Sequence, residues 1–209
     1  MAYESARKHK EVANEYRRAE EFSEAGDYFT TAAYAYLGDS PPKTGLGITN
    51  AEYCLLQAVV CYRLGDQFSR AVNRSRQGIL IAEDVLDRVL AAETPENVYD
   101  RARRGALYEF IGDFRVVGDL DGADEAYDAA VEIYEEAGDP TTGYSEQERM
   151  RLMDFLDLVG TAVGEELEAS WRTGQHNSTF TEWVAYKRDQ LPSVVTELMA
   201  LGTWNWDDV

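Results

Sequence analysis

The sequence predicts an all-α protein made of antiparallel helix hairpins, a short α-solenoid of about eight helices. Two observations lead to this class: most long segments repeat apolar residues every three or four positions, and no alternating run rich in Val, Ile and Thr indicates a strand. A third observation is a Gly-Asp junction that recurs between helices. The length of 209 residues fits one domain. We therefore expect a single helical domain over residues 1–203 and an acidic, tryptophan-containing tail over residues 204–209.

Four helices are expected in the first half of the chain, as two pairs. The apolar spacing places the first two over residues 5–25 and 27–37. A loop over residues 38–48 follows, because its two Pro and three Gly exclude a helix. The third helix begins at Thr49 or Asn50, and the fourth covers about residues 66–91.

Four more helices are expected in the second half. Pro95 opens the fifth, which ends near Val117, and the sixth covers residues 120–137. Ser145 and Glu148 form a capping box for the seventh. The eighth begins near residue 181, and Pro192 is expected to kink or split it, because proline removes a backbone donor.

Three of the helix junctions look alike: Gly26-Asp27, Gly65-Asp66 and Gly118-Asp119. A glycine can take the left-handed conformation that ends a helix, and an aspartate can cap the next helix. An alanine about one turn later lets two antiparallel helices approach closely. The sequence therefore predicts a degenerate helix-hairpin repeat.

One stretch of the chain carries a family pattern: large, large, small and aromatic positions in a first helix, then Gly, Ala, aromatic and Ala in a second. The residues are Leu107, Phe110, Ile111, Phe114, Gly118, Ala123, Tyr127 and Ala130. With them the chain resembles the tetratricopeptide-repeat superfamily, and the segment 24–36 looks like its longer-helix, SNAP-type members. The resemblance covers about residues 5–140 and implies a superhelix whose first helices line a concave face. A generic helical bundle without a groove is the alternative.

The net charge of −19, from 39 acidic and 20 basic residues, limits the classes of partner. It argues against binding to nucleic acid or to an anionic membrane surface, since both need clustered cations. Only 4 of the 20 bases are Lys, and the acids are spread along the chain, which is typical of a protein from a halophile. The first residues lack the apolar core of a signal peptide, so we expect a cytoplasmic location.

No motif in the sequence indicates catalysis, a cofactor or a metal. Residues 38–44 resemble a phosphate-binding loop, but Pro42 replaces the required Gly and no strand precedes it. Cys54 and Cys61 share one helix face and are expected to be small buried side chains. The two histidines, His9 and His176, have no ligand spacing. We therefore expect a protein that is not an enzyme.

The sequence does indicate a candidate binding groove on the first helices of the second and third pairs. Its residues are Tyr53, Arg63, Arg101, Arg104, Tyr108 and Arg115. Arginines gathered in an acidic protein can hold carboxylates through forked hydrogen bonds, although internal acids can also pair with them. We therefore expect a non-enzymatic module that binds a peptide or protein segment. A regulator that senses a small anionic ligand is the alternative.

Two further expectations concern association and the tail. The tail residues Trp204 and Trp206 are expected to fold back on the last helix pair. The alternative is that they dock on a partner, which includes a second copy of the chain in a homodimer.

Overall fold

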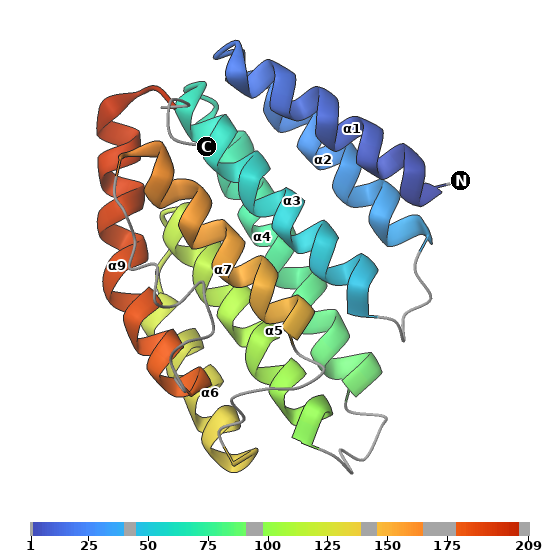
Figure 1. The fold of residues 1–209 in the computed structure, drawn as a ribbon, viewed down its shortest axis with the longest axis vertical. Helices are drawn as coiled ribbons and strands as arrows, with labels where there is room; N and C mark the ends of the chain where they lie inside the picture. The colour runs from blue at the N-terminus through green and yellow to red at the C-terminus, as the bar shows by residue number, and fades with distance from the viewer. Residues whose placement is uncertain (1, 40–44, 91–97, 139–145, 165–178, 205–209) are drawn as a thin grey trace.

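The computed structural model describes residues 2–39, 45–90, 98–138, 146–164 and 179–204. Over these residues the protein is all-α, with eight α-helices, one π-helical turn and no strand. The predicted fold class is thus confirmed (Figure 1). The elements are α1 Ala2–Arg18, α2 Phe22–Asp39, α3 Gly45–Leu64, α4 Phe68–Asp84, η1 Val85–Leu90, α5 Val98–Val117, α6 Ala123–Glu136, α7 Glu146–Ala162 and α9 Phe180–Leu201.

The first six helices form three hairpins that pack side by side. α1 pairs with α2, α3 with α4 and α5 with α6, and the hairpins meet where α2 packs on α3 and α4 on α5. This order repeats one supersecondary unit along the chain, as a helical-repeat fold does. Of the residues on which the tetratricopeptide resemblance rests, all but the half-buried Ala123 are buried.

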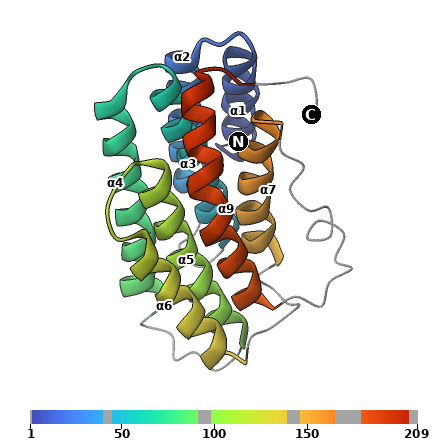
Figure 2. The ribbon, with the colours of Figure 1, turned by 90° about the vertical axis from the view of Figure 1, so that its left-hand side faces the viewer.

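The last two described helices do not extend the stack as a fourth hairpin. α7 packs against α3, α5 and α9, and α9 packs against α5 and α6 (Figures 1 and 2). The face formed by the first helices α3 and α5, which was expected to be an open concave surface, is therefore in contact with the chain's own α7. The binding groove that the sequence predicts on these first helices is therefore covered at least in part by α7.

The central helix α3 explains why the molecule holds together. Every residue from 47 to 62 is buried, because α3 touches α2, α4, α5 and α7 on different sides. Its sequence is mainly apolar and its polar residues do not gather on one side, so it lacks the polar face of a surface helix. The largest cluster of buried residues includes Leu55, Val59 and Tyr62 of this helix and extends to Phe155 of α7 and Leu198 of α9.

The three hairpin turns are identical in geometry, although not in the way the junction sequences predicted. The left-handed residue is acidic in each turn: Glu20, Asp66 and Asp119 have φ of 58°, 57° and 54°. In the second turn the amide of Gln67 donates to the carbonyl of Tyr62 (2.7 Å), and the amide of Asp66 donates to that of Arg63 (3.1 Å). These paired bonds define a Schellman motif, which satisfies the last carbonyls of a helix.

The glycines at these turns have a packing role instead. A Cβ at Gly65 would lie 3.2 Å from the backbone nitrogen of Ser23, and one at Gly118 would overlap Ser75. The small residue therefore lets neighbouring hairpins approach each other, and the following acid takes the positive φ.

The first turn lies at residues 19–21, not at Gly26-Asp27 as predicted. α1 ends at Arg18 and α2 already begins at Phe22, so Gly26 is inside a helix. It is there because a Cβ at Gly26 would lie 2.6 Å from the ring of Tyr62. Asp27 does not cap a helix; its carboxylate accepts a hydrogen bond from the Tyr62 hydroxyl (2.7 Å) and pairs with Arg70.

Several other boundaries differ from the prediction. The expected loop 38–48 is partly helical, since α2 ends at Asp39 and α3 begins at Gly45. The fourth predicted helix changes from α to π geometry at Val85. Ser145, half of the expected capping box, lies outside the described residues, whereas Thr179 and Glu182 form a complete capping box for α9.

The C-terminal helix is continuous through Pro192, so this residue does not split it. The chain then returns to the N-terminal hairpin. Trp204 is 2% exposed, and the guanidinium carbon of Arg17 lies 4.4 Å from the centre of its ring. The tail tryptophan thus folds back and contacts α1, and Trp206 lies outside the described residues.

Two glycines of α5, Gly105 and Gly112, lie against aromatic rings of α6, and Gly112 can be tested by substitution. A Cβ at Gly112 would lie 2.5 Å from the ring of Tyr127, whose hydroxyl is fixed by Asp113 (2.8 Å). Gly112→Ala is therefore expected to lower the free energy of unfolding by about 1–3 kcal/mol, as overpacking of a core does.

The matched control is Gly38→Ala, because Gly38 is also helical but has nothing within 4 Å of the added methyl group. Alanine stabilises an open helical position, so this variant should equal or exceed the wild type. Chemical denaturation measures both. Equal stability of the two variants would contradict the packing role of Gly112.

Candidate functional site

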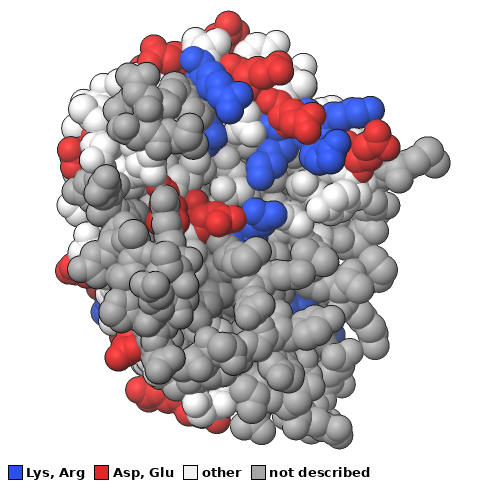
Figure 3. All heavy atoms as spheres, viewed as in Figure 1, with Lys and Arg blue, Asp and Glu red and all other residues white. Residues whose placement is uncertain are grey.

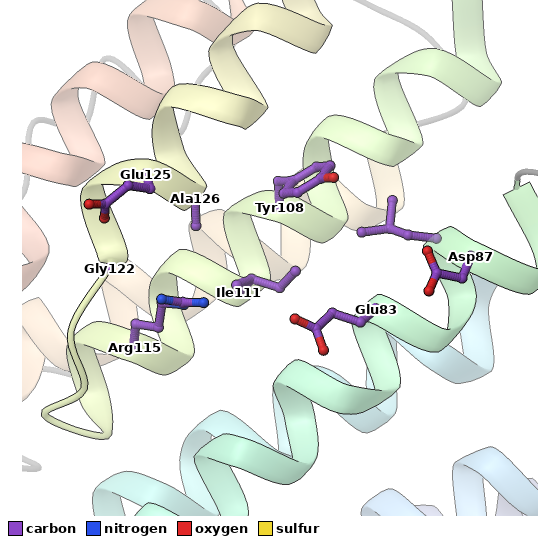
Figure 4. Close-up of a pocket in the computed structure, with 9 residues that line it drawn as sticks. Glu83, Asp87, Tyr108, Ile111, Arg115, Gly122, Glu125 and Ala126 are labelled. Atoms are coloured by element: carbon purple, nitrogen blue, oxygen red, sulfur yellow. The ribbon is translucent and has the colours of Figure 1, made fainter.

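A surface pocket of about 400 Å³ lies between η1, α5 and α6. The apolar part of its lining consists of the buried Ile111 and Ala126 and the half-buried Leu86 and Tyr108. Figure 4 shows Arg115 and Glu83 pointing toward one another across Ile111. The volume lies in the range of small-ligand pockets, and the apolar base with a charged rim gives it both contact area and polarity.

The pocket carries more negative than positive charge. Three exposed carboxylates, Glu83, Asp87 and Glu125, line it together with one cation, Arg115. Opposite charges on opposing walls favour a ligand group that is itself charged. The excess of carboxylates favours a cationic group.

Arg115 is held in place by the turn that leads into α6. Its Nη1 donates to the carbonyl oxygen of Asp121 (2.7 Å). Gly122, with φ of 86°, leaves room for the guanidinium, because a Cβ there would overlap Nη1. The Nε of Arg115 is buried and has no partner in the described part of the chain. The hairpin turn therefore fixes the orientation of Arg115 at the pocket.

Of the six residues predicted to form a groove, the structure brings Tyr108 and Arg115 together in this pocket. The other two arginines of the third pair lie elsewhere on α5 or are not described. Arg104 is half-buried on α5, and the side chain of Arg101 lies outside the described part.

The two residues predicted from the second pair lie apart from the pocket. Nη1 of Arg63 donates to the carbonyl oxygen of Val117 (2.9 Å), so Arg63 ties α3 to the end of α5, and burial lowers its pKa. Tyr53 is 7% exposed and lies beneath Lys10 and Arg151, from α1 and α7. The structure thus does not place Tyr53 and Tyr108 on one face as equivalents.

Sequence reasoning missed a buried ionic cluster between α5, α6 and α9. Nζ of Lys187 lies 2.7 Å from Oε2 of Glu109 and 3.1 Å from Oδ2 of Asp113, and all three side chains are at most 2% exposed. Each carboxylate also accepts a hydrogen bond from a tyrosine hydroxyl of α6, at 2.8 Å for Tyr127 to Asp113 and 2.5 Å for Tyr134 to Glu109. The Lys187 ammonium and two tyrosine hydroxyl groups thus provide the polar contacts of the two buried carboxylates.

Two opposing effects govern charge in this cluster. Burial raises the pKa of Asp113 to about 6, although Lys187 counteracts that rise. Burial alone would lower the pKa of Lys187, but Asp113 and Glu109 outweigh it and the pKa is raised. The ammonium form is therefore fixed in the interior. A lysine and two acids on separate helices give no local sequence signal, because only the fold brings them together.

No family model matches the chain, and neither a curated protein nor a solved structure is significantly similar to it.

A second missed group is Glu52, which faces the interior from α3. Its side chain is fully buried, and neither carboxylate oxygen has a hydrogen-bond partner among the residues that the structure describes. Burial raises the pKa of Glu52 well above its usual value. A buried carboxyl group without a partner is therefore neutral at moderate pH.

The cysteines and histidines of the described residues show no reactive or metal-binding arrangement. Cys54 and Cys61 are free and buried, and burial raises the pKa of each thiol to about 12, which disfavours the reactive thiolate. His9 lies 6.1 Å from the ring of Tyr28, and His176 is outside the described residues. Within the described ranges, no three His, Cys, Asp or Glu side chains cluster as a metal site. A membrane-spanning helix is likewise not found there.

Proposed function

We propose that this chain is a non-enzymatic helical-repeat module that binds a peptide or protein segment. The observation that carries the proposal is the pocket between η1, α5 and α6, which combines an apolar base with charged side chains on opposing walls. Its acidic residues Glu83, Asp87 and Glu125 are exposed, so the site is open to solvent at the rim. Such a site suits one anchoring side chain of a larger partner whose remainder lies on the surrounding surface.

The anchoring side chain is basic. Three carboxylates against Arg115 give the pocket a negative field, and Leu86 with Ile111 supplies apolar area for a methylene stem. Lys and Arg combine a charged head with such a stem. This charge preference reverses the one suggested by the arginines in the sequence, because those arginines are spread over different surfaces.

Two further proposals about the chain accompany this function. The hairpin repeat and the residues 107–130 support membership of a tetratricopeptide-like superfamily, whose members commonly bind peptides. The net charge of −19 with few lysines supports an origin in a high-salt cytoplasm. Binding is therefore best measured in KCl at several concentrations, with circular dichroism used to check that the protein is folded in each.

A displayed library of random dodecapeptides tests the proposed function. We expect enrichment of peptides with one Lys or Arg flanked by apolar residues. Glu83→Gln/Asp87→Asn should weaken the binding of an enriched peptide by about tenfold, which corresponds to about 1.4 kcal/mol. Tyr108→Ala should weaken it as well, through lost contact area.

The matched control is Glu132→Gln/Glu135→Gln, which removes two exposed charges from α6 outside the pocket. This variant should bind as the wild type does. Failure to enrich any peptide, or equal weakening by both double variants, would contradict the pocket as the binding site.

A further inference from the structure

The N-terminal helix is basic in an otherwise acidic protein. α1 carries five basic side chains, Arg7, Lys8, Lys10, Arg17 and Arg18, against three acidic ones, Glu4, Glu11 and Glu15. Figure 3 shows Lys and Arg side chains gathered on the upper right of this face, over α1, with acids among them. The surface over α1 therefore differs in sign from the chain as a whole.

Two cations from different helices converge on the Tyr53 ring. Nζ of Lys10, from α1, lies 4.9 Å from the ring centre, and the guanidinium carbon of Arg151, from α7, lies 5.4 Å from it. Tyr53 is buried in α3, so its ring is a fixed contact surface for both cations. α1 and α7 lie on either side of α3 in Figure 1.

The donors of these two cations are not all used within the described residues. Arg151 donates from Nε to Asn50 (3.1 Å) and from Nη1 to Asp154 (2.9 Å), and its Nη2 has no partner there. Lys10 is half-buried, its ammonium contacts the Tyr53 ring, and this ammonium makes no hydrogen bond or ion pair within that part of the chain. An ammonium and a guanidinium nitrogen, neither with a hydrogen-bond acceptor among the described residues, thus belong to side chains that contact the same ring.

The electrostatics of this place are unfavourable without an anion. Burial lowers the pKa of Lys10, and repulsion from Arg151 and Arg17 lowers it further against the attraction of Cys54 and Asp154. Arg17 lies two turns along the same face of α1, and burial lowers its pKa too. Lys10 and Arg151 therefore share one nearby carboxylate, that of Asp154, in a partly desolvated region, and a bound anion would compensate the excess charge.

We propose that Lys10 and Arg151 form a binding site for a small oxyanion, with Tyr53 as its base. Lys10 provides a mobile ammonium donor and Nη2 of Arg151 a planar one, which together contact two oxygens of the same group. Phosphate and carboxylate share this chemistry. The site lies between α1 and α7, whereas the proposed peptide pocket lies between η1, α5 and α6, so the two proposals are independent.

Lysine-selective ¹³C labelling tests the site, because the chain has four lysines and therefore four side-chain signals. Inorganic phosphate or acetate is added at constant ionic strength, set with KCl. We expect a saturable shift of the Lys10 signal with at least one of the two anions and a higher Lys10 pKa in its presence. The anion that saturates at the lower concentration identifies the preferred chemistry.

Two variants test the residues of the site. Lys10→Gln should weaken the binding of the anion, measured by thermal unfolding, at least tenfold. Arg151→Gln should weaken it at least tenfold as well, measured through the Lys10 signal. The matched control is Lys8→Gln, since Lys8 is an exposed neighbour on α1 that pairs with Glu4. A Lys10 shift that is linear and equal to that of Lys8 with both anions would overturn the proposal. Glu83→Gln/Asp87→Asn should leave the anion response unchanged, which separates this test from that of the peptide pocket.

Discussion

Lys187→Met is expected to lower the free energy of unfolding by about 3–5 kcal/mol at neutral pH, because it leaves buried carboxylates without their cation. Glu109 and Asp113 are at most 2% exposed and lie within 3.1 Å of the lysine nitrogen. The deficit should shrink as the pH falls, since protonated carboxyl groups no longer need a cation. Denaturant unfolding at pH 5 and pH 7 measures both effects.

Two further variants separate the ionic role of Lys187 from a general sensitivity of α9. Arg188→Met removes the next cation along the helix, which pairs with the exposed Asp124 and Asp128, and should cost about 1 kcal/mol or less. Lys187→Met/Glu109→Gln/Asp113→Asn removes all three charges and should recover much of the stability lost in the single variant. A Lys187→Met deficit as small as that of Arg188→Met would contradict the argument.

The helix class was predictable because local spacing encodes it, whereas the turn register was not. Residues 19–21 form the first hairpin turn with the same two hydrogen bonds as the Gly65-Asp66 turn. The sequence signal was present, since an acid follows a small residue and a Phe comes two positions later, in both Ala19-Glu20-Glu21-Phe22 and Gly65-Asp66-Gln67-Phe68. Gly26-Asp27 concealed it, because a glycine needed for contact with Tyr62 looks the same in sequence as one that ends a helix.

The sequence predicted two residues of the pocket, Tyr108 and Arg115, but not the carboxylates that line it with them. Tyr108 and Arg115 are seven residues apart and therefore share a helix face, so local periodicity brings them together. The carboxylates opposite them come from α4, η1 and α6, and their position depends on how the hairpins pack. The same holds for Lys10 and Arg151, which meet at Tyr53 because α7 packs on α3 and not beside α6.

Glu52→Gln is expected to make the protein more stable than the wild type, by an amount that grows with pH. In the unfolded chain Glu52 loses its proton above about pH 4.5, but burial raises its pKa in the folded protein, so folding takes up a proton in this range. Wild-type stability must then fall as the pH rises, by up to about 1.4 kcal/mol per pH unit, until the pH passes the folded pKa. Glutamine does not ionise and removes this dependence.

The measurement is the difference in unfolding free energy between Glu52→Gln and the wild type, at constant KCl, from pH 4 to pH 8. The contribution of Asp113, whose raised pKa of about 6 also lowers stability as the pH rises from about 4 to 6, is present in both proteins and cancels. The matched control is Glu24→Gln, which makes the same change at an exposed position of α2. A flat difference for Glu52→Gln would mean that the folded protein holds Glu52 ionised, and a cation or donor would then have to satisfy its two buried oxygens.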